Sequence, residues 1–463
     1  MLIINGKVFL PSLDEPADVD IRIRDGKIAE IGTKLPRNDE ILDAEGYIIL
    51  PGAIDPHTHF NDPGYKEKED FYHGTSAAAS GGITTIIDMP CTSVPPVTNL
   101  ENLRTKLAAI EKKAVVDFGL YGGVSGQSFE QDFPDNIIEL APKILGFKTY
   151  FISGMDTFAR LNHYQFEQVV RKAIELRVPV LVHAEDFDYI DYATKLARLR
   201  GDKPYDYYLS RPEIAEIIAV QEIAAIVENI LSEPKYAEIV ESSGIKPVHI
   251  VHISAAKSVE ILADEPITCE TAPHYLAFDL DDFIEIASPL KVTPVVKPSP
   301  NREKLWKFLA DGSIDFIASD HAPAGENEKF TNSIWTDYSG IPGTETLLPY
   351  LFSEGYLSGK ISLKRLVEIT SSAAAKRYGI YDRKGSIEID KDADFVIIDP
   401  NSNFKVDGTK LYSKGKITPF DGFTFRGKIV KTIVRGKIVY DCDEGIVADA
   451  GYGKNILSNR GNR

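Results

Sequence analysis

The chain contains eight short apolar runs, and most of the segments between them have the apolar spacing of amphipathic helices. YQFEQVVRKAIELR and PEIAEIIAVQEIAAIVENIL are typical of these segments. Apolar runs that alternate with such helices predict buried parallel strands, and eight units of this kind predict a (β/α)8 TIM-type barrel of the α/β class. The eight runs are GAIDPHTHF, TTIIDMP, VVDFGLYGG, ILGFKTYF, PVLVHAED, PVHIVHIS, ITCETAPH and IDFIASDHAP.

The two ends of the chain have a different pattern, with short alternating segments separated by turn dipeptides. LIINGKVFL, DIRIRDGKIAEIG and GYIILP stand at the start, and DADFVIIDP and FRGKIVKTIVRGKIVYD stand near the end. The NG, DG, EG, RG and KG dipeptides predict antiparallel hairpins. Because chain ends tend to lie close together, we expect both ends to build one small β-sandwich. The expected division is 1–51 for its N-terminal part, 52–388 for the barrel, and 389–463 for its C-terminal part and tail.

Composition and charge narrow the choice of partner. The 463 residues are 43% hydrophobic and 26% charged, which is ordinary for a globular protein. The formal net charge of -17 repels phosphate backbones and anionic lipids, so we expect a small-molecule partner, no nucleic acid and no membrane. Cys91, Cys269 and Cys442 lack paired spacing, and no export signal or membrane-length apolar stretch occurs. These features predict a cytoplasmic protein.

Histidines and an aspartate stand at the ends of several apolar runs. His57 and His59 are two residues apart, so a strand would point both side chains to one face. By itself this spacing also fits structural histidines. His183, His252 and Asp320 each close another run, at the strand end where barrel enzymes carry their chemistry. If all five were merely buried polar groups, each would need its own hydrogen-bond partners. The pattern therefore favours a metal site.

Lys148 is the remaining candidate at this rim. It lies within the apolar run ILGFKTYF, where a charged amine is costly unless it is paired or neutralised. A desolvated lysine loses its proton readily and can react with carbon dioxide to give a carbamate with two oxygens able to bridge two metals. The alternative is a lysine that reaches outward from the strand end to solvent.

The other histidines have simpler interpretations. His249 is three residues before His252, so strand alternation predicts that the two point to opposite faces, and we interpret His249 as structural. We expect His274 to be structural or to support the pocket. His73 and His163 fall in polar stretches and are expected to face solvent.

Six motifs, in this order, resemble those of the cyclic amidohydrolases of the amidohydrolase superfamily: DPHTHFNDPG, GFKTYF, VHAE, VHISAA, PHYLAFD and SDHAP. The likeness extends over essentially the whole chain. It implies two divalent metal ions, usually zinc (Zn2+), bridged by carboxylated Lys148. It also implies that Asp320 is the base that takes a proton from the attacking water and returns it to the leaving nitrogen. The implied metal ligands are His57, His59, Lys148, His183, His252 and Asp320.

Within this family the motifs are most similar to those of allantoinases, which implies hydrolysis of allantoin to allantoate. Dihydroorotases usually carry Arg, Asn and His where this chain has Asn61, Cys91 and Ala324, and those groups are expected to hold the substrate carboxylate. Tyr275, in ETAPHYL, also resembles the allantoinase pattern, whereas GYKEKEDF and GIPGTETLLP would fit a dihydroorotase. Dihydroorotase and hydantoinase or dihydropyrimidinase are therefore the alternatives.

The resemblance also implies contacts to a cyclic amide or ureide substrate. Ser153 stands where hydantoinases often have a tyrosine that steadies the developing oxyanion, and its hydroxyl could still donate. Thr293 lies in the loop whose backbone usually grips the ring amide. Asn61 either contacts the substrate or forms the turn before Pro63. Relatives are commonly homotetramers, so a homo-oligomer, either a tetramer or a dimer, is expected. A noncatalytic scaffold is the alternative of another class, and it need not retain metal ligands.

Overall fold

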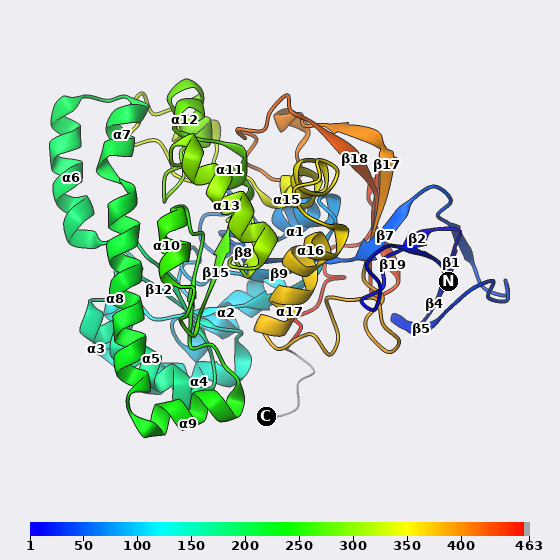
Figure 1. Ribbon diagram of the computed structural model, residues 1–463, viewed down its shortest axis with the longest axis horizontal. Coiled ribbons are helices and arrows are strands. Elements are labelled where there is room, and N and C mark those ends of the chain that lie inside the picture. Colours follow the sequence, from blue (N-terminus) through cyan, green and yellow to red (C-terminus); the bar gives the residue numbers. More distant parts are fainter. Residues whose placement is uncertain (458–463) are drawn as a thin grey trace.

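A ring of eight parallel strands forms the centre of the molecule, and helices surround it (Figure 1). The computed structural model describes residues 1–457. β10 continues after Tyr121 as β11 (Gly122–Gly123), which pairs with β12. The ring closes where Thr58 bridges to His321 and the His59 amide donates to the His321 carbonyl at 2.8 Å. Each predicted apolar run overlaps one of these strands, so the predicted barrel is confirmed. The strands are β8 (Ala53–Thr58), β9 (Ile83–Asp88), β10 (Asp117–Leu120), β12 (Phe147–Tyr150), β13 (Val180–His183), β14 (Val248–Ile250), β15 (Ile267–Thr271) and β16 (Phe316–Ile317).

The outer helices bury one face against this ring. Helix α5 (His163–Leu176) shows why: its buried positions recur every three to four residues, which is the helical period. Its N-terminus is capped by Asn162, whose side chain accepts from the Gln165 amide, and it ends at Arg177 in the left-handed conformation. The long helix α8 (Glu213–Leu231) also packs against the ring. Shorter members are α1 (Phe71–Ser80), α2 (Leu100–Ile110), α10 (Ala256–Ile261) and α13 (Ser299–Asp311).

The two ends of the chain meet in a pair of sheets beside the barrel (Figure 1). One sheet has the order β5-β4-β1-β6 and the other β20-β19-β18-β17-β7-β2-β3, and β7 pairs antiparallel with β17. Ile21 from the first sheet and Ile49 and Phe395 from the second belong to one buried core, so the predicted sandwich is confirmed. The strands are β1 (Leu2–Ile4), β2 (Lys7–Val8), β3 (Ala17–Asp18), β4 (Asp20–Arg24), β5 (Lys27–Gly32), β6 (Ile41–Asp43), β7 (Ile48–Pro51), β17 (Phe395–Lys405), β18 (Thr424–Val434), β19 (Lys437–Asp441) and β20 (Gly445–Ile446).

Only some of the predicted turn dipeptides form hairpins, and Glu45-Gly46 instead connects β6 in one sheet to β7 in the other. Asp25-Gly26 joins β4 to β5, and both residues have positive φ as a tight hairpin turn requires. Asn5-Gly6 does not form a hairpin, and this prediction was wrong. It carries the chain from β1 in one sheet to β2 in the other, because Ile3 and Val8 fill the same core from the two sheets. The division at 1–51, 52–388 and 389–463 stays a prediction.

A buried ion-pair cluster joins the barrel to the sandwich. Lys384 Nζ lies 2.6 Å from Asp117 Oδ2 in β10 and 2.6 Å from Asp394 Oδ2, just before β17. Arg435, in the turn between β18 and β19, also pairs with Asp117. Because Lys384 already occupies the space between these carboxylates, they form a structural network and do not suit a metal ion.

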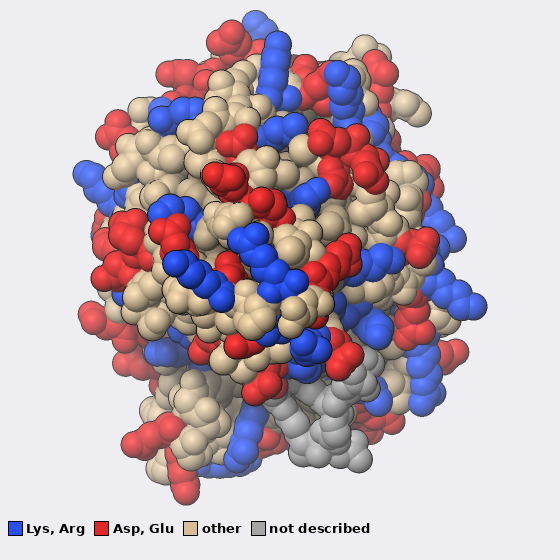
Figure 2. Space-filling model, turned by 90° about the vertical axis from the view of Figure 1, so that its right-hand side faces the viewer, with Lys and Arg blue, Asp and Glu red and all other residues tan. Residues whose placement is uncertain are grey.

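The surface carries charges of both signs. On the face shown in Figure 2, Lys and Arg side chains are interspersed with Asp and Glu side chains. Within residues 1–457, no helix combines the length and apolar character needed to cross a membrane.

Candidate metal centre

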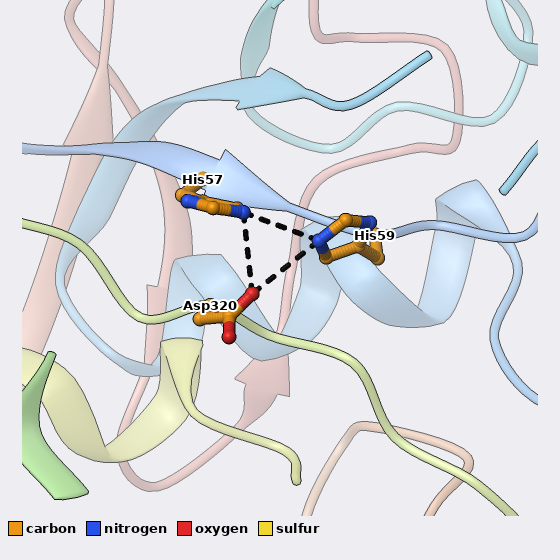
Figure 3. A group of neighbouring side chains, drawn as sticks. All are labelled: His57, His59 and Asp320. Atoms are coloured by element: carbon orange, nitrogen blue, oxygen red, sulfur yellow. Dashed lines mark hydrogen bonds and ion pairs between the residues drawn. The ribbon is translucent and has the colours of Figure 1, made fainter. Parts of the chain in front are cut away.

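Three side chains converge at the seam where the barrel closes (Figure 3). His57 lies in β8, His59 follows that strand, and Asp320 follows β16. Asp320 Oδ1 is 3.2 Å from His57 Nε2 and 3.3 Å from His59 Nε2, and the two nitrogens are 3.2 Å apart. Two imidazole nitrogens and a carboxylate oxygen this close together are a ligand set that suits a divalent cation.

His183 and His252 extend the cluster. His183 Nδ1 lies 3.0 Å from His252 Nε2, and the rings of His252 and His57 are 5.4 Å apart between centroids. The four histidines therefore form a continuous group at the carboxyl-terminal ends of β8, β13 and β14, the rim where barrel enzymes place their active sites.

Lys148 points into the same space. It lies in β12, is completely buried, and its Nζ has no hydrogen-bond partner among residues 1–457. Burial lowers its pKa to about 8, although Cys91, Asp320 and Glu270 oppose that shift. An unpartnered amine this deep in the protein is costly in its charged form. Its position and its lowered pKa fit the carbamate chemistry expected of this residue.

The backbone is bent at two of these positions. His252 has φ 42° and Asp320 has φ 50°, in the left-handed region that residues other than glycine seldom adopt. Buried hydrogen bonds next to Asp320 hold its backbone in this conformation. The Ser319 amide and hydroxyl donate to Asp55 at 3.0 and 2.5 Å. Such strain is typical of functional sites.

The bend at His252 also corrects one prediction. Strand alternation predicted that His249 and His252 point to opposite faces, but both point into the barrel. His249 Nε2 lies 3.2 Å from Glu270 Oε2, and His252 lies beside His183. The prediction was wrong because β14 ends at Ile250, so the chain is no longer extended at His252.

Carboxylates that the sequence analysis missed orient two of the histidines. Glu270 Oε1 lies 2.5 Å from His57 Nδ1, and Glu185 Oε2 lies 2.9 Å from His183 Nε2. Arg211 pairs with Glu185 in turn. These bonds leave His57 Nε2 and His183 Nδ1 facing the centre, which is how carboxylates commonly fix metal-binding imidazoles. The sequence could have indicated Glu270, because a glutamate inside the apolar run ITCET is costly to bury and needs a partner.

Neighbouring groups at the centre shift the pKa values of His59 and Asp320 in opposite directions. Burial alone would lower the pKa of His59, but Cys91 and Asp320 outweigh it and raise that pKa to about 10. Burial would raise the pKa of Asp320, yet His57 and His59 hold it well below its usual range. The lowered pKa of Asp320 favours its ionised form, and a carboxylate beside two imidazoles favours a bound cation.

Cys91 and Tyr150 border the cluster and were not predicted as site residues. Cys91 Sγ lies 3.0 Å from Tyr150 Oη and 3.7 Å from His59 Nδ1. The Tyr150 ring stacks on that of His183. Tyr150 is two residues after Lys148 in the same strand, and this spacing is the signal that could have found it.

The three predicted substrate contacts lie in the connections after β8, β12 and β15. Asn61 is buried, and its amide donates to the His59 carbonyl at 3.3 Å. The Ser153 hydroxyl donates to the Phe158 carbonyl at 2.6 Å. Thr293 Oγ1 lies 3.2 Å from Tyr207 Oη. Each hydroxyl or amide thus already has a protein partner, which a substrate would have to replace or share.

The remaining histidines lie as follows. The side chains of His73 and His163 are 42% and 51% exposed, as expected for solvated positions. His274 is buried next to Tyr275, and its Nε2 has no hydrogen-bond partner within residues 1–457. His321 is also buried, with Nε2 3.2 Å from Glu69 and with Nδ1 accepting from two backbone amides.

A hollow of about 1580 Å3 lies at the opposite end of the barrel. Its lining includes Pro179, Lys246, Thr268 and Asp315, which stand at the amino-terminal side of the barrel strands. Barrel enzymes carry out their chemistry at the other end, so this hollow is not the candidate active site.

The fold is that of a barrel enzyme, and the group of histidines with Asp320 is a candidate metal site at its active end. The sequence profile of the Amidohydrolase family matches residues 48–439. The chain belongs to this family, and it is a hydrolase that acts on C–N bonds of cyclic amides.

Similar proteins cover almost the full length. An allantoinase from Rubrobacter xylanophilus is 34% identical over 460 residues, which are 97% of this chain and 96% of that protein. An allantoinase from Escherichia coli is 33% identical over 456 residues, 96% of each chain. Among solved structures, an L-hydantoinase (dihydropyrimidinase) from Arthrobacter aurescens has a TM-score of 0.88 and 29% identity over 98% of each chain. A D-hydantoinase from a Bacillus species has a TM-score of 0.85 and 30% identity over 98% of each chain.

Proposed function

We propose that this protein is an allantoinase, which opens the hydantoin ring of allantoin to give allantoate. The observation that carries the proposal is the convergence of four histidines, Asp320 and an unpartnered buried lysine at one rim of the barrel. Full-length similarity to allantoinases supports the choice of substrate.

We propose that two divalent cations, with zinc as the expected metal, bind at this rim. The buried Lys148 amine and the buried His252 Nδ1, both without a hydrogen-bond partner in residues 1–457, support this proposal. When bound, such ions supply Lewis acidity toward the ring carbonyl and acidify water. Imidazole and carboxylate also accept manganese, cobalt or iron. The residues that would hold the ions are His57, His59, Lys148 as its carbamate, His183, His252 and Asp320.

Asp320 is proposed as the proton carrier. It is ionised and lies at the rim beside His57 and His59, so it can accept a proton from the attacking water. The same carboxyl then returns the proton to the ring nitrogen as the C–N bond breaks. Glu270 and Glu185 keep the imidazoles of His57 and His183 in the required orientation during these steps.

We propose Asn61, Ser153 and Thr293 as substrate contacts, because each lies in a loop at the carboxyl-terminal side of the barrel. A dihydroorotase would need cationic or strong donor groups for a carboxylate. Cys91 contacts Tyr150 and His59 and offers no such group, which favours allantoin over dihydroorotate.

A substrate panel tests the proposal. The protein, expressed with zinc, manganese or cobalt, is incubated with allantoin, dihydroorotate, hydantoin and dihydrouracil, and the ring-opened products are measured. Turnover of allantoin above the other three is expected, with Asp320→Asn as the inactive control. Turnover confined to dihydroorotate would overturn the substrate assignment. Fewer than about one tightly bound divalent ion per chain would favour a noncatalytic scaffold.

We also propose a cytoplasmic homo-oligomer, a dimer or tetramer. Helix α6 (Phe187–Arg200), at the outer edge of the molecule, supports an interface between copies (Figure 1). Its outward face carries Tyr189, Tyr192, Leu196 and Leu199, and Tyr192 and Leu199 are 65% and 85% exposed. A continuous apolar stripe this exposed is typical of an interaction surface. Cys91, Cys269 and Cys442 are free thiols, which supports a reducing compartment.

The charges on α6 favour a second copy of the chain. Asp188 and Asp191 lie in the first half of the helix, and Lys195 and Arg200 lie in the second. Asp191 and Lys195 pair with each other at 2.6 Å within one helix, and antiparallel pairing of two such helices about a twofold axis would let acidic and basic halves pair between copies as well.

A further inference from the structure

A chain of buried hydrogen-bonding side chains runs down the barrel from His57. Glu270 Oε1 lies 2.5 Å from His57 Nδ1, and Glu270 Oε2 lies 3.2 Å from His249 Nε2. His249 Nδ1 lies 2.8 Å from Thr268 Oγ1. Thr268 lines the hollow at the amino-terminal end of the barrel. The chain therefore connects the candidate metal rim with the other end of the barrel.

The donor and acceptor in each of these hydrogen bonds can be assigned by starting from His57. His57 Nε2 faces His59 and Asp320, so a cation there requires the proton of His57 to be on Nδ1, from which it is donated to Glu270. The second oxygen of Glu270 then accepts from Nε2–H of His249. A histidine that donates from Nε2 accepts at Nδ1, and the Thr268 hydroxyl is the donor. Every member of the chain then has a partner.

His249 is held firmly in this place. Its ring is fully buried and stacks on Phe316, with centroids 4.9 Å apart and an angle of 11° between the planes. Both ring nitrogens are within hydrogen-bonding distance of a partner, Thr268 on one side and Glu270 on the other. Burying an imidazole in this core has a desolvation cost that an apolar side chain would not have. The presence of His249 therefore calls for a role beyond packing.

We propose that His249 is a positioning residue for the metal centre: by donating to Glu270 it fixes the carboxylate that orients His57. Without this donor, Glu270 keeps only the His57 ring and the His252 backbone amide as hydrogen-bond partners, so the carboxylate is less firmly fixed and can turn away from His57 Nδ1. His57 would then lose its fixed orientation and present Nε2 less often to a cation. The inference rests on the proposed metal role of His57, and its test separates the two.

The test is divalent-metal affinity, measured by competition with a coloured chelator on the whole protein. We compare His249→Leu, His249→Asn and His249→Gln with the unchanged chain, using zinc as the probe. The Gln amide reaches the place of Nε2 and can donate to Glu270, whereas the Asn amide reaches only the place of Nδ1. Removing a partner that orients a metal ligand typically costs about 10- to 100-fold in affinity.

The expected result is a loss of that size in His249→Leu and His249→Asn and a clear recovery in His249→Gln. If His249→Leu does not fold, the comparison of Asn with Gln decides. Equal zinc affinity in the Asn and Gln variants would overturn the proposal. If the unchanged chain itself binds no zinc, the proposed metal site fails, which is a different outcome.

Matched threonine variants separate positioning from general destabilisation. Thr268→Val removes the donor to His249 and should also weaken zinc binding. Thr149→Val removes another buried strand hydroxyl, which donates to the Leu181 carbonyl at 3.1 Å. It should lower the melting temperature and leave zinc affinity unchanged. Equal losses of affinity in the two threonine variants would show a merely structural effect and overturn the proposal.

Discussion

The Nζ atom of Lys148 lies 4.9 Å from the centre of the Tyr150 ring and has no hydrogen-bond partner in the described part of the chain, residues 1–457. If this amine becomes a bridging carbamate, Lys148→Ala should lower kcat by more than about 100-fold, because even partners that only orient ligands are worth 10- to 100-fold. Acetate or propionate should restore part of the activity by occupying the vacated space. Activity is measured with allantoin over a series of acid concentrations.

Lys106→Ala is the control for that experiment. Lys106 is as deeply buried as Lys148, but its amine pairs with Asp88 and donates to Ser93. Short carboxylic acids should not raise the activity of this variant. Full activity in Lys148→Ala without added acid would exclude a bridging carbamate.

A second prediction concerns the link between barrel and sandwich. Lys384→Met leaves Asp394 without its ammonium partner and leaves Asp117 with Arg435 alone, and breaking a buried pair in this way typically costs about 3–5 kcal/mol. Denaturant unfolding at pH 7 measures the loss. Lys7→Met is the control, because its pair with Asp18 is largely exposed and should contribute less than about 1 kcal/mol. Equal losses in the two variants would contradict a structural role for the buried cluster.

A third prediction concerns pH. Asp70 caps α1, and its side chain accepts from the His73 amide. Burial would raise its pKa, but hydrogen bonds from Lys414 and His73 outweigh burial and lower it to about 2, below the value of 3.8 expected in the unfolded chain. The stabilisation is therefore present above pH 3.8 and is lost as the pH falls toward 2.

Asp70→Ala should destabilise the protein by about 1 kcal/mol at pH 7, because it removes a helix cap. Asp70→Asn keeps a capping oxygen and should lose only the charged contacts with Lys414 and the His73 ring. Thermal unfolding at several pH values between 7 and 3 measures both. The gap between Asp70→Asn and the unchanged protein should narrow below pH 3.8; a gap that widens on acidification would contradict the assignment.

The exposed stripe on α6 gives a fourth prediction. Tyr192→Asp combined with Leu196→Asp should lower the oligomeric state, because two charges would face the apolar surface of the second copy. Light scattering after size exclusion gives the molar mass. Tyr164→Asp, at an equally exposed tyrosine on α5, is the control and should not change the mass. If the double variant keeps the mass of the unchanged protein, α6 is not the interface.

The candidate site could be predicted where strand geometry alone decides direction. His57 and Lys148 lie on strands whose ends meet at one rim, so position in the apolar runs was enough to bring them together. It was not enough for the direction of His249, because the backbone turns left-handed at His252 after β14 and the two-residue alternation no longer relates the two histidines. The pairing of His57 with Glu270 joins residues 213 positions apart, and no local pattern carries that information.

The fold shows the same limit at the terminal segments. Local turn chemistry identified the hairpin at Asp25-Gly26 because both strands belong to one sheet. At Asn5-Gly6 the same kind of dipeptide leads between sheets, since the choice depends on which core surface each strand covers. Turn residues set the local bend, whereas burial sets the partner strand.

The closing seam of the barrel has a consequence for assembly of the native state. The first and last barrel strands meet through the bridge between Thr58 and His321, and His57, His59 and Asp320 flank that bridge from the two sides. A cation held by these three side chains would fasten the start of the barrel to its end. Binding of the ion would then stabilise the closed barrel, so that formation of the mature enzyme would depend on the supply of metal.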